Sequence, residues 1–245
     1  MIQSNKPSLD LIFRQALTYW KNTLVYQLLF SLIFISVLFS VVYYAANQFG
    51  IYDQYISILQ KNSGDMTALQ KDIQDLTKSS NYISFSWVMI ATMVFLFPLN
   101  IGFFKLYKKM DLNEEIRFQD FFSGYSGINF FIYISYYLFW FMVYSYTMPT
   151  IIFGILWVMI TLFTTPLMFF DNKKIFETLS LNFQAMKQHF LVIFVGVISA
   201  FFIKYSGFLI FGFGILFTYP FFNAMIYALY KNIFVESKTS SQTQS

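Results

Sequence analysis

Polar side chains that could do chemistry within the apolar stretches of this chain are few, and they carry amides and hydroxyls. Asn100 and Asn223 each follow a proline by two or three residues, while Thr165 and Thr218 each precede a proline by one or two residues. A proline frees a backbone carbonyl one turn earlier, so nearby amides or hydroxyls can bond to that carbonyl or clip two helices together. The same four side chains could instead line a polar pocket at the centre of a helical bundle. We favour the clip and keep the pocket as the alternative.

The ionisable side chains give little support to catalysis. The chain has no cysteine, which excludes thiol nucleophiles and thiolate metal sites, and its one histidine, His189, has no acidic pair nearby and is interpreted as an interfacial anchor. One acidic cluster is interleaved with basic residues and fits the spacing of no metal-binding loop, so we interpret it as a solvated loop. Its members are Asp111, Glu114, Glu115 and Asp120. We expect neither enzyme activity nor a metal or other cofactor.

The composition is typical of a membrane protein. Hydrophobic residues make up 57% of the 245 residues and charged residues only 11%, against about 25% charged in soluble domains. A helix needs about 20 apolar residues to cross the bilayer core, so the charge-poor stretches predict six spans. The predicted spans cover residues 23–46, 82–105, 127–146, 149–170, 189–205 and 208–231. We expect no ionisable side chain at membrane depth, because Lys204 can extend its ammonium to the interface.

The positions of the basic residues predict the orientation of the spans. Twelve of the sixteen lysines and arginines fall on the side that holds both termini, and only Lys61, Lys71, Lys78 and Lys204 fall on the other. Cationic side chains are retained on the cytoplasmic side, so both termini are expected in the cytoplasm, and the composition fits a bacterial inner membrane. The basic loops are too mixed with acids to bind nucleic acid, whereas they suit the headgroups of membrane lipids.

The predicted fold class is all-α, a polytopic membrane protein whose six transmembrane helices form three hairpins. An amphipathic stripe at helical spacing precedes each hairpin, which is typical of a helix in the interfacial plane. These stripes lie in residues 9–20, 118–125 and 176–190. The second helix of each hairpin contains one proline that bends it, namely Pro98, Pro166 and Pro220. We expect a single transmembrane domain over residues 1–234 and a disordered polar tail over residues 235–245.

Two segments with one pattern, LNIGFFKLYKK and FNAMIYALYKN, end the second and the sixth predicted helix. We interpret them as the cytoplasmic exits of equivalent helices, with Tyr107 and Tyr230 at the membrane interface. Small residues spaced by four predict close helix association, within the chain or between two copies. These residues are Gly196, Ala200, Ala224 and Ala228.

Only one predicted outer connection has any size. Residues 50–79 carry apolar residues at helical spacing on both sides of a polar turn, which predicts a small helical hairpin. Its apolar faces are the candidate surface for a protein partner or a second copy of the chain. The residues of this surface are Tyr55, Leu59, Leu69 and Ile73.

The last third of the chain carries short motifs that resemble a known group. TPLMFFD at residues 165–171, TLS at residues 178–180 and GFGILFTYP at residues 212–220 resemble uncharacterised bacterial multi-pass membrane proteins, which are similar to the membrane domain of some glycerophosphodiester phosphodiesterases. The resemblance implies an all-helical membrane domain with proline-bent spans. It implies no catalytic residue, because the phosphodiesterase catalytic domain has no counterpart in this chain.

Two functions fit these observations. The first is a non-enzymatic membrane component that binds lipid or a protein partner through its interfacial helices and outer hairpin. The alternative is a conduit for a lipid or another amphipathic molecule, which would pass Asn100 and Asn223 along the bent helices. An enzyme that relies on a tyrosine, a serine or Asp171 is the least favoured reading.

Overall fold

The computed structural model describes residues 8–127, 129–209 and 212–236, and over these residues the chain is helical without a β-strand. The all-α prediction is confirmed to that extent. The chain packs as two compact units, each described below by itself. We call Leu32–Leu96 the hairpin unit, and Met1–Ser31 together with Phe97–Ser245 the bundle unit.

Four helical segments of the described chain are long and apolar enough to cross a bilayer. They are α2 (Leu24–Gln48), the pair α5 and α6 (Ser80–Asp111), the pair α8 and α9 (Ile151–Asp171), and α10 with the short 3-10 helix η2 (Ile175–Leu209). A fifth is added if η1 (Phe118–Tyr125) and α7 (Asn129–Thr147), bent by 67°, count as one. Helices of this length and hydropathy are typical of polytopic membrane proteins.

The sixth predicted span, residues 208–231, is not one continuous helix. The described part of it contains the end of η2 (Gly207–Leu209), the four-residue helix α11 (Ile215–Thr218) and α12 (Phe221–Tyr230). Gly212 lies between these helices with φ +79°, in the left-handed region that favours glycine. High hydropathy predicts a span there, but the local glycines interrupt the helix.

Two predicted elements of the chain form one helix. The amphipathic stripe over residues 176–190 and the fifth predicted span both belong to α10 (Ile175–Ser206), which has a kink at His189 with φ −125° and ψ 29°. The stripe over residues 9–20 forms the separate helix α1 (Leu9–Asn22), and α2 begins two residues later at Leu24. The backbone therefore turns between an amphipathic and an apolar segment in both places.

Each of the three prolines lies at a junction between helices. Pro98 directly precedes α6 (Leu99–Asp111), Pro220 directly precedes α12, and Pro166 is the third residue of α9 (Thr164–Asp171). Proline loses no intrahelical bond in the first turn of a helix, because the N–H groups there have no helical partner in any case. A preceding helix cannot continue through such a position unbent, so the prolines explain the breaks.

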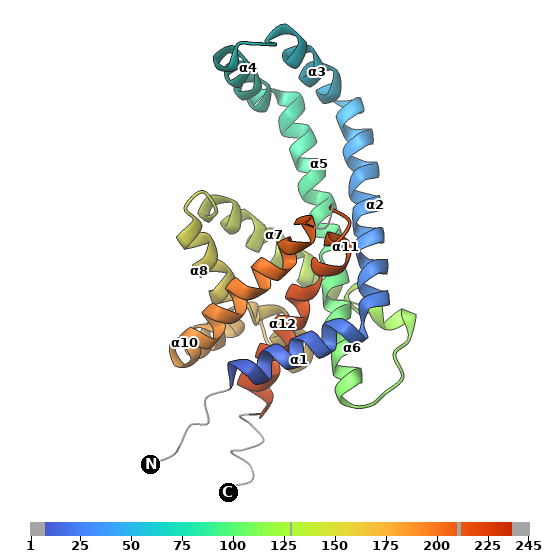
Figure 1. Ribbon diagram of the computed structural model, residues 1–245, viewed down its shortest axis with the longest axis vertical. Helices are drawn as coiled ribbons and strands as arrows, with labels where there is room; N and C mark the ends of the chain where they lie inside the picture. Colours follow the sequence, from blue (N-terminus) through green and yellow to red (C-terminus); the bar gives the residue numbers. More distant parts are fainter. Residues whose placement is uncertain (1–7, 128, 210–211, 237–245) are drawn as a thin grey trace, which may run out of the picture. The chain divides into compact units, whose positions relative to one another are not determined.

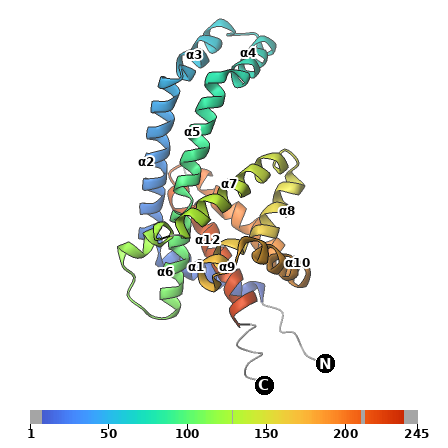
Figure 2. The same ribbon diagram turned by 180° about the vertical axis from the view of Figure 1, so that it is seen from behind.

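Helix α12 is the centre of the bundle unit, where α1, α6 and α10 pack against it (Figures 1 and 2). Eight of its ten residues are buried. The small residues expected to bring helices together lie in this packing: Ala200, Ala224 and Ala228 are fully buried, and Gly196 of α10 faces Leu229 of α12. These small-residue faces are therefore covered within one chain and do not remain open for a second copy.

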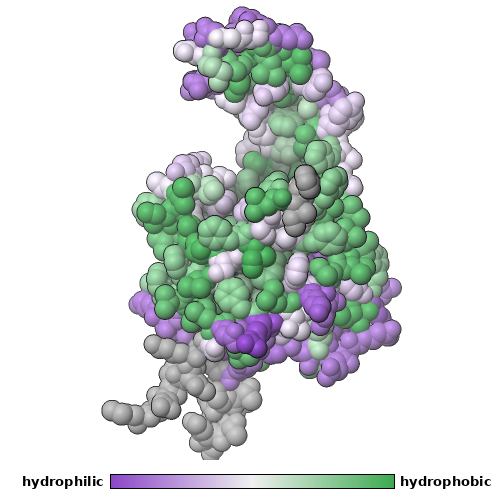
Figure 3. Space-filling model, viewed as in Figure 1, coloured by the Kyte–Doolittle hydropathy of each residue, from purple (hydrophilic) through white to green (hydrophobic). Residues whose placement is uncertain are grey.

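The two tyrosines expected at the membrane interface lie inside the bundle unit. Tyr107 is fully buried and Tyr230 is only 4% exposed. The ring of Tyr107 lies 5.3 Å from that of Tyr19 and 5.5 Å from that of Tyr227, measured between centroids. Helix α1 covers this end of α6 and α12. The edge of the bundle unit is therefore formed by α1 and not by the two tyrosines. In the bundle unit, Figure 3 shows polar side chains gathered along that edge.

The hairpin unit consists of α2 from Leu32 onward, two short helices, α3 (Ile51–Lys61) and α4 (Met66–Lys78), and α5 (Ser80–Leu96). Asp65 caps α4 by accepting the N–H groups of Thr67 and Ala68, both at 3.0 Å. Asp72 accepts hydrogen bonds from Lys61 and Asn62, also at 3.0 Å. These contacts hold α3 and α4 together within residues 50–79.

Candidate functional site

The two predicted asparagines meet in the bundle unit. The side-chain amide of Asn223 donates to Oδ1 of Asn100 at 3.0 Å and joins α12 to α6, while Asn100 donates to the carbonyl of Phe97 at 3.1 Å. That carbonyl lies at the break before α6, where Pro98 interrupts the helical ladder. The pair therefore acts as a helix clip and also satisfies the backbone at a proline break.

The same asparagines line a small cavity, which we call the polar pocket. Its volume is about 180 Å³, and Thr165 lies in its wall as the sequence predicts. Its other polar wall residues are Tyr136, Tyr137, Trp140, Thr161 and Lys204, and its apolar wall includes Phe97, Val158 and Phe222. Thr218 does not line it and instead donates from α11 to the backbone carbonyl of Lys204 at 2.9 Å. The sequence analysis treated the helix clip and the polar pocket as alternatives, but the structure contains both.

Lys204 is the residue of this site that sequence reasoning placed elsewhere. The sequence predicts that its ammonium extends to the membrane interface; in the structure Lys204 lines the polar pocket, and its ammonium lies 4.1 Å from the ring centroid of Tyr219 and 5.8 Å from that of Phe222. Aromatic faces attract a cation, and the rings of Tyr205, Tyr219 and Phe222 all lie close to this one. Lys204 lies within the candidate membrane helix α10, as the predicted span over residues 189–205 requires.

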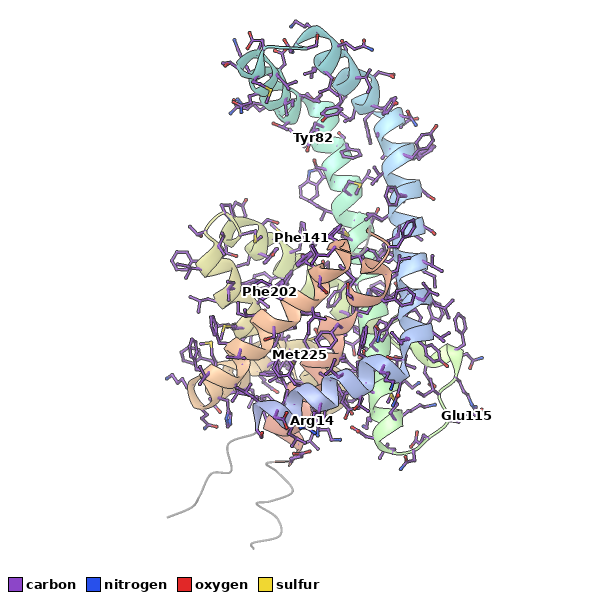
Figure 4. All side chains as sticks on the ribbon, viewed as in Figure 1. Arg14, Tyr82, Glu115, Phe141, Phe202 and Met225 are labelled. Atoms are coloured by element: carbon purple, nitrogen blue, oxygen red, sulfur yellow. The ribbon has the colours of Figure 1, made fainter. Side chains whose placement is uncertain are left out.

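An apolar groove of about 750 Å³ lies beside the polar pocket. Residues of α7, α8, α10 and η2 form it, among them Tyr144, Ile151, Ile155, Val158, Ile198, Phe201, Phe202 and Leu209. Phe202 on α10 is 75% exposed (Figure 4). Val158 belongs to the walls of both the groove and the pocket, and the ring of Phe201 in the groove lies 5.1 Å from that of Phe222 in the pocket. The groove and the pocket are therefore adjacent.

A second polar cluster joins α1, α6 and α12 around Asp111, which the sequence analysis assigned to an acidic loop. Asp111 accepts hydrogen bonds from Tyr19 at 2.6 Å and from Tyr227 at 2.9 Å, and it forms an ion pair with Lys231 at 2.7 Å. Burial, followed by the hydrogen bond to Asp111, raises the pKa of Tyr19, so its hydroxyl stays protonated and donates. We call these four residues the Asp111 cluster.

Asp120 is likewise held by basic groups and is not a residue of a solvated loop. Its carboxylate forms ion pairs with Lys105 at 2.8 Å and Lys109 at 2.6 Å, and it accepts the backbone N–H of Arg117 at 2.9 Å. Its side chain is 7% exposed, and that of Asp111 is 22% exposed. The prediction of a solvated acidic loop is therefore wrong for Asp111 and Asp120, because folding brings cations to both.

Asn182 is a further buried amide that sequence reasoning did not single out. It accepts the N–H of Phe163 at 2.7 Å and donates to the carbonyl of Thr178 at 2.7 Å and to Thr164 at 3.2 Å. Phe163 is at the break before α9, where the first N–H groups lack helical partners. Phe163 and Asn182 are 19 residues apart in the sequence, so no local pattern indicates their contact.

The predicted partner surface lies on α3 and α4. Tyr55 is 44% and Leu59 38% exposed, whereas Leu69 and Ile73 are partly covered. The apolar face that remains open is thus mainly on α3. Across the described ranges, no three His, Asp or Glu side chains are placed to hold a metal ion.

Comparisons with known proteins found no relative of this chain. No family model matches the sequence, and neither the curated proteins nor the solved structures contain a significant match to the chain. The site must therefore be interpreted from its own residues.

Proposed function

We propose that this protein is a non-enzymatic membrane component that binds a membrane lipid between its helices. The observation that carries the proposal is the apolar groove of about 750 Å³, which adjoins a polar pocket at Val158. Ligand sites are typically clefts of 300–1,000 Å³ with a mostly apolar lining and a few convergent polar groups. An apolar tail beside a polar headgroup has the complementary chemistry, and in a bilayer the molecule with that chemistry is a lipid.

The proposal assigns no catalytic role to the carboxylates of the bundle unit. Asp111 and Asp120 are each bonded to at least one lysine and to further donors, so their charges are already compensated. Groups held in this way stabilise the packing of helices. This supports a binding protein over a hydrolase.

The same proposal includes six membrane crossings with both termini in the cytoplasm of a bacterial cell. Twelve of sixteen basic residues on the side of the termini support this orientation, and the sixth crossing would be the broken path through η2, α11 and α12. Fluorescent protein fused after Ser245 should fold and emit, and alkaline phosphatase fused there should be inactive. The opposite pair of results would contradict the orientation.

The lipid-binding proposal is tested by filling the groove. Ile155 lines the groove, whereas Ile152 on the same helix is 73% exposed and does not. Each is replaced by tryptophan, and the lipid that remains bound after purification in detergent is measured by native mass spectrometry. We expect Ile155→Trp to lose most of the bound lipid and Ile152→Trp to retain it. Equal retention by both variants would show that the groove holds no lipid.

A conduit for lipid is the second candidate, because Val158 makes the groove and the pocket adjacent. Movement of a fluorescent phospholipid between leaflets of reconstituted vesicles would distinguish the two. Leaflet exchange faster than in protein-free vesicles, and abolished by Ile155→Trp, favours the conduit. The resemblance to the membrane domain of glycerophosphodiester phosphodiesterases is also part of this proposal, but it assigns no further residue to the lipid site.

A further inference from the structure

The ammonium of Lys204 has no carboxylate partner within the described ranges 8–127, 129–209 and 212–236. It lies over the rings of Tyr219, Tyr205 and Phe222, at 4.1, 5.5 and 5.8 Å from their centroids. Aromatic faces stabilise a cation but leave its charge in place. A cation held among apolar and aromatic side chains without a counter-charge is costly, and such a residue in a helical membrane bundle commonly marks a binding site.

Further donors surround this charge. Each side-chain amide carries two N–H groups, and the structure engages one of them in Asn223, with Asn100, and one in Asn100, with the carbonyl of Phe97. The hydroxyl of Thr165 lies in the same wall. The polar pocket therefore offers one positive charge and several neutral donors without an acidic group in its wall.

We infer that the polar pocket binds the phosphate of a membrane phospholipid, with the Lys204 ammonium as its counter-charge and the Asn100 and Asn223 amides as hydrogen-bond donors, while an acyl chain of the same lipid lies in the apolar groove. This inference rests on the proposed lipid-binding function and names the class of lipid. Val158 lies in the walls of both the groove and the pocket, so the acyl chain and the phosphate of one lipid would occupy adjoining sites.

The donor set favours phosphate over the carboxylate of a fatty acid. A planar carboxylate is matched best by the fork of an arginine, whereas lysine acts on phosphate as a point charge. Phosphate also presents more oxygen atoms to donors that come from different directions, here from α6, α9, α10 and α12. The bilayer around the protein supplies phosphate-bearing lipids at high concentration.

The test compares two dioleoyl lipids that differ only in the headgroup, and a fatty acid with the same kind of chain and a carboxylate. Delipidated protein in a non-ionic detergent is titrated with dioleoylphosphatidylglycerol, with dioleoylglycerol and with oleate, and binding is measured by native mass spectrometry. The phosphate-bearing lipid should bind the wild-type protein at least about tenfold more tightly than the other two, since one hydrogen-bonded charge contributes that much. Lys204→Met should abolish this preference but keep the weaker binding of dioleoylglycerol.

Lys187→Met is the matched control. Lys187 is also on α10, and its ammonium lies 4.7 Å from the ring centroid of Phe183, but it does not line the pocket. The Lys187→Met protein should bind all three lipids as the wild type does. The Lys204→Arg protein should retain part of the preference for phosphatidylglycerol, because arginine keeps the positive charge. If Lys204→Met does not fold, two other measurements test the phosphate site. The first is the ratio of the affinities of the wild type for the three lipids, and the second is Asn223→Leu, which should weaken only the binding of phosphatidylglycerol.

Each of the other possible binding results would overturn one specific part of the proposal. Equal binding of phosphatidylglycerol and dioleoylglycerol by the wild type would overturn the phosphate site and leave the lipid-binding proposal intact. Tighter binding of oleate would overturn the choice of phosphate over carboxylate. A preference that survives Lys204→Met would overturn the role of Lys204. Failure of all three lipids to bind would overturn the proposed function itself.

Discussion

Replacing Asp111 with alanine removes one carboxylate that three side chains share. Tyr19, Tyr227 and Lys231 all bond to it, at 2.6, 2.9 and 2.7 Å, and thereby connect α1, α6 and the start of the π-helical turn η3 (Lys231–Val235). A hydrogen bond to a charged group contributes about 1.5–3 kcal/mol when it is shielded from water. The side chains of Asp111 and Lys231 are 22% and 25% exposed, so the low end of that range applies.

The three bonds together should then contribute about 4.5 kcal/mol to the free energy of unfolding. In a chain of this size, that loss lowers the midpoint of thermal unfolding by about 10 °C. The assay is tryptophan emission during heating in detergent, because Trp20 of α1 donates to the carbonyl of Phe217 at 2.8 Å and will report the release of α1. Asp111→Asn keeps partners for the two phenols and should lose about half as much.

The matched control is Asp10→Ala on α1. Asp10 pairs with Arg14 at 2.9 Å, but both side chains are at least 70% exposed. Such pairs contribute about 0–1 kcal/mol, so the midpoint should move by no more than about 4 °C. The reasoning is refuted if Asp111→Ala shifts the midpoint no more than Asp10→Ala does.

Three further predictions concern other contacts. Asn182→Ala leaves the buried N–H of Phe163 without its acceptor and should cost about 2–3 kcal/mol, seen as a lower thermal midpoint. Gly102→Ala places a Cβ against the backbone carbonyl of Phe121, so we expect a loss of at least about 2 kcal/mol by the same assay. Hydrogen bonds to Asp72 from Asn62 and then Lys61 hold the pKa of Asp72 below its ordinary 3.8. Their stabilisation of α3 and α4 is therefore present above pH 3.8 and lost as the pH falls through the lower pKa, which amide hydrogen exchange at pH 5 and pH 3 measures.

Each of these substitutions has a control variant that distinguishes the loss of the named contact from a general loss of stability. Gln184→Ala alters an exposed amide two residues from Asn182 and should leave the midpoint unchanged. Gly154→Ala adds a Cβ that meets its nearest neighbour at an ordinary 3.4 Å and should be tolerated. Asp72→Asn should remove the loss of protection at pH 3, where protection is the exchange rate relative to the intrinsic rate at the same pH. A midpoint that falls equally in a variant and its control, or a loss of protection at pH 3 that persists in Asp72→Asn, would contradict the corresponding argument.

The parts of the fold that the sequence predicts are those set by local chemistry. Amphipathic spacing predicts α1, long apolar runs predict α2 and the second half of α10, and a proline at a helix start explains the break before α6 and α12. The hydrogen bond from Asn100 to the carbonyl of Phe97 follows the same logic, because an amide beside a proline break has unpaired backbone nearby, whereas its pairing with Asn223, 123 residues away, does not. Local patterns are sufficient where the nearest neighbours in sequence decide the structure.

The parts that could not be predicted depend on residues far apart in the chain. Asp111 meets Tyr19 and Tyr227 across separations of 92 and 116 residues, so a local charge pattern could not distinguish it from a solvated acid. Lys204 is near a helix end, where lysine commonly reaches the interface, and the local sequence could not show that its ammonium contacts the rings of Tyr219, which follows α11, and Phe222 of α12. Packing between distant segments decided both cases.

The most direct test of lipid binding is a density map of the protein in lipid nanodiscs at a resolution that shows ordered lipids. Our account predicts an elongated density in the groove that passes Ile155 and Phe202, with a compact density of phosphate size at the Lys204 ammonium. A map in which α8 and α10 close against each other and the Lys204 ammonium contacts only protein would contradict it.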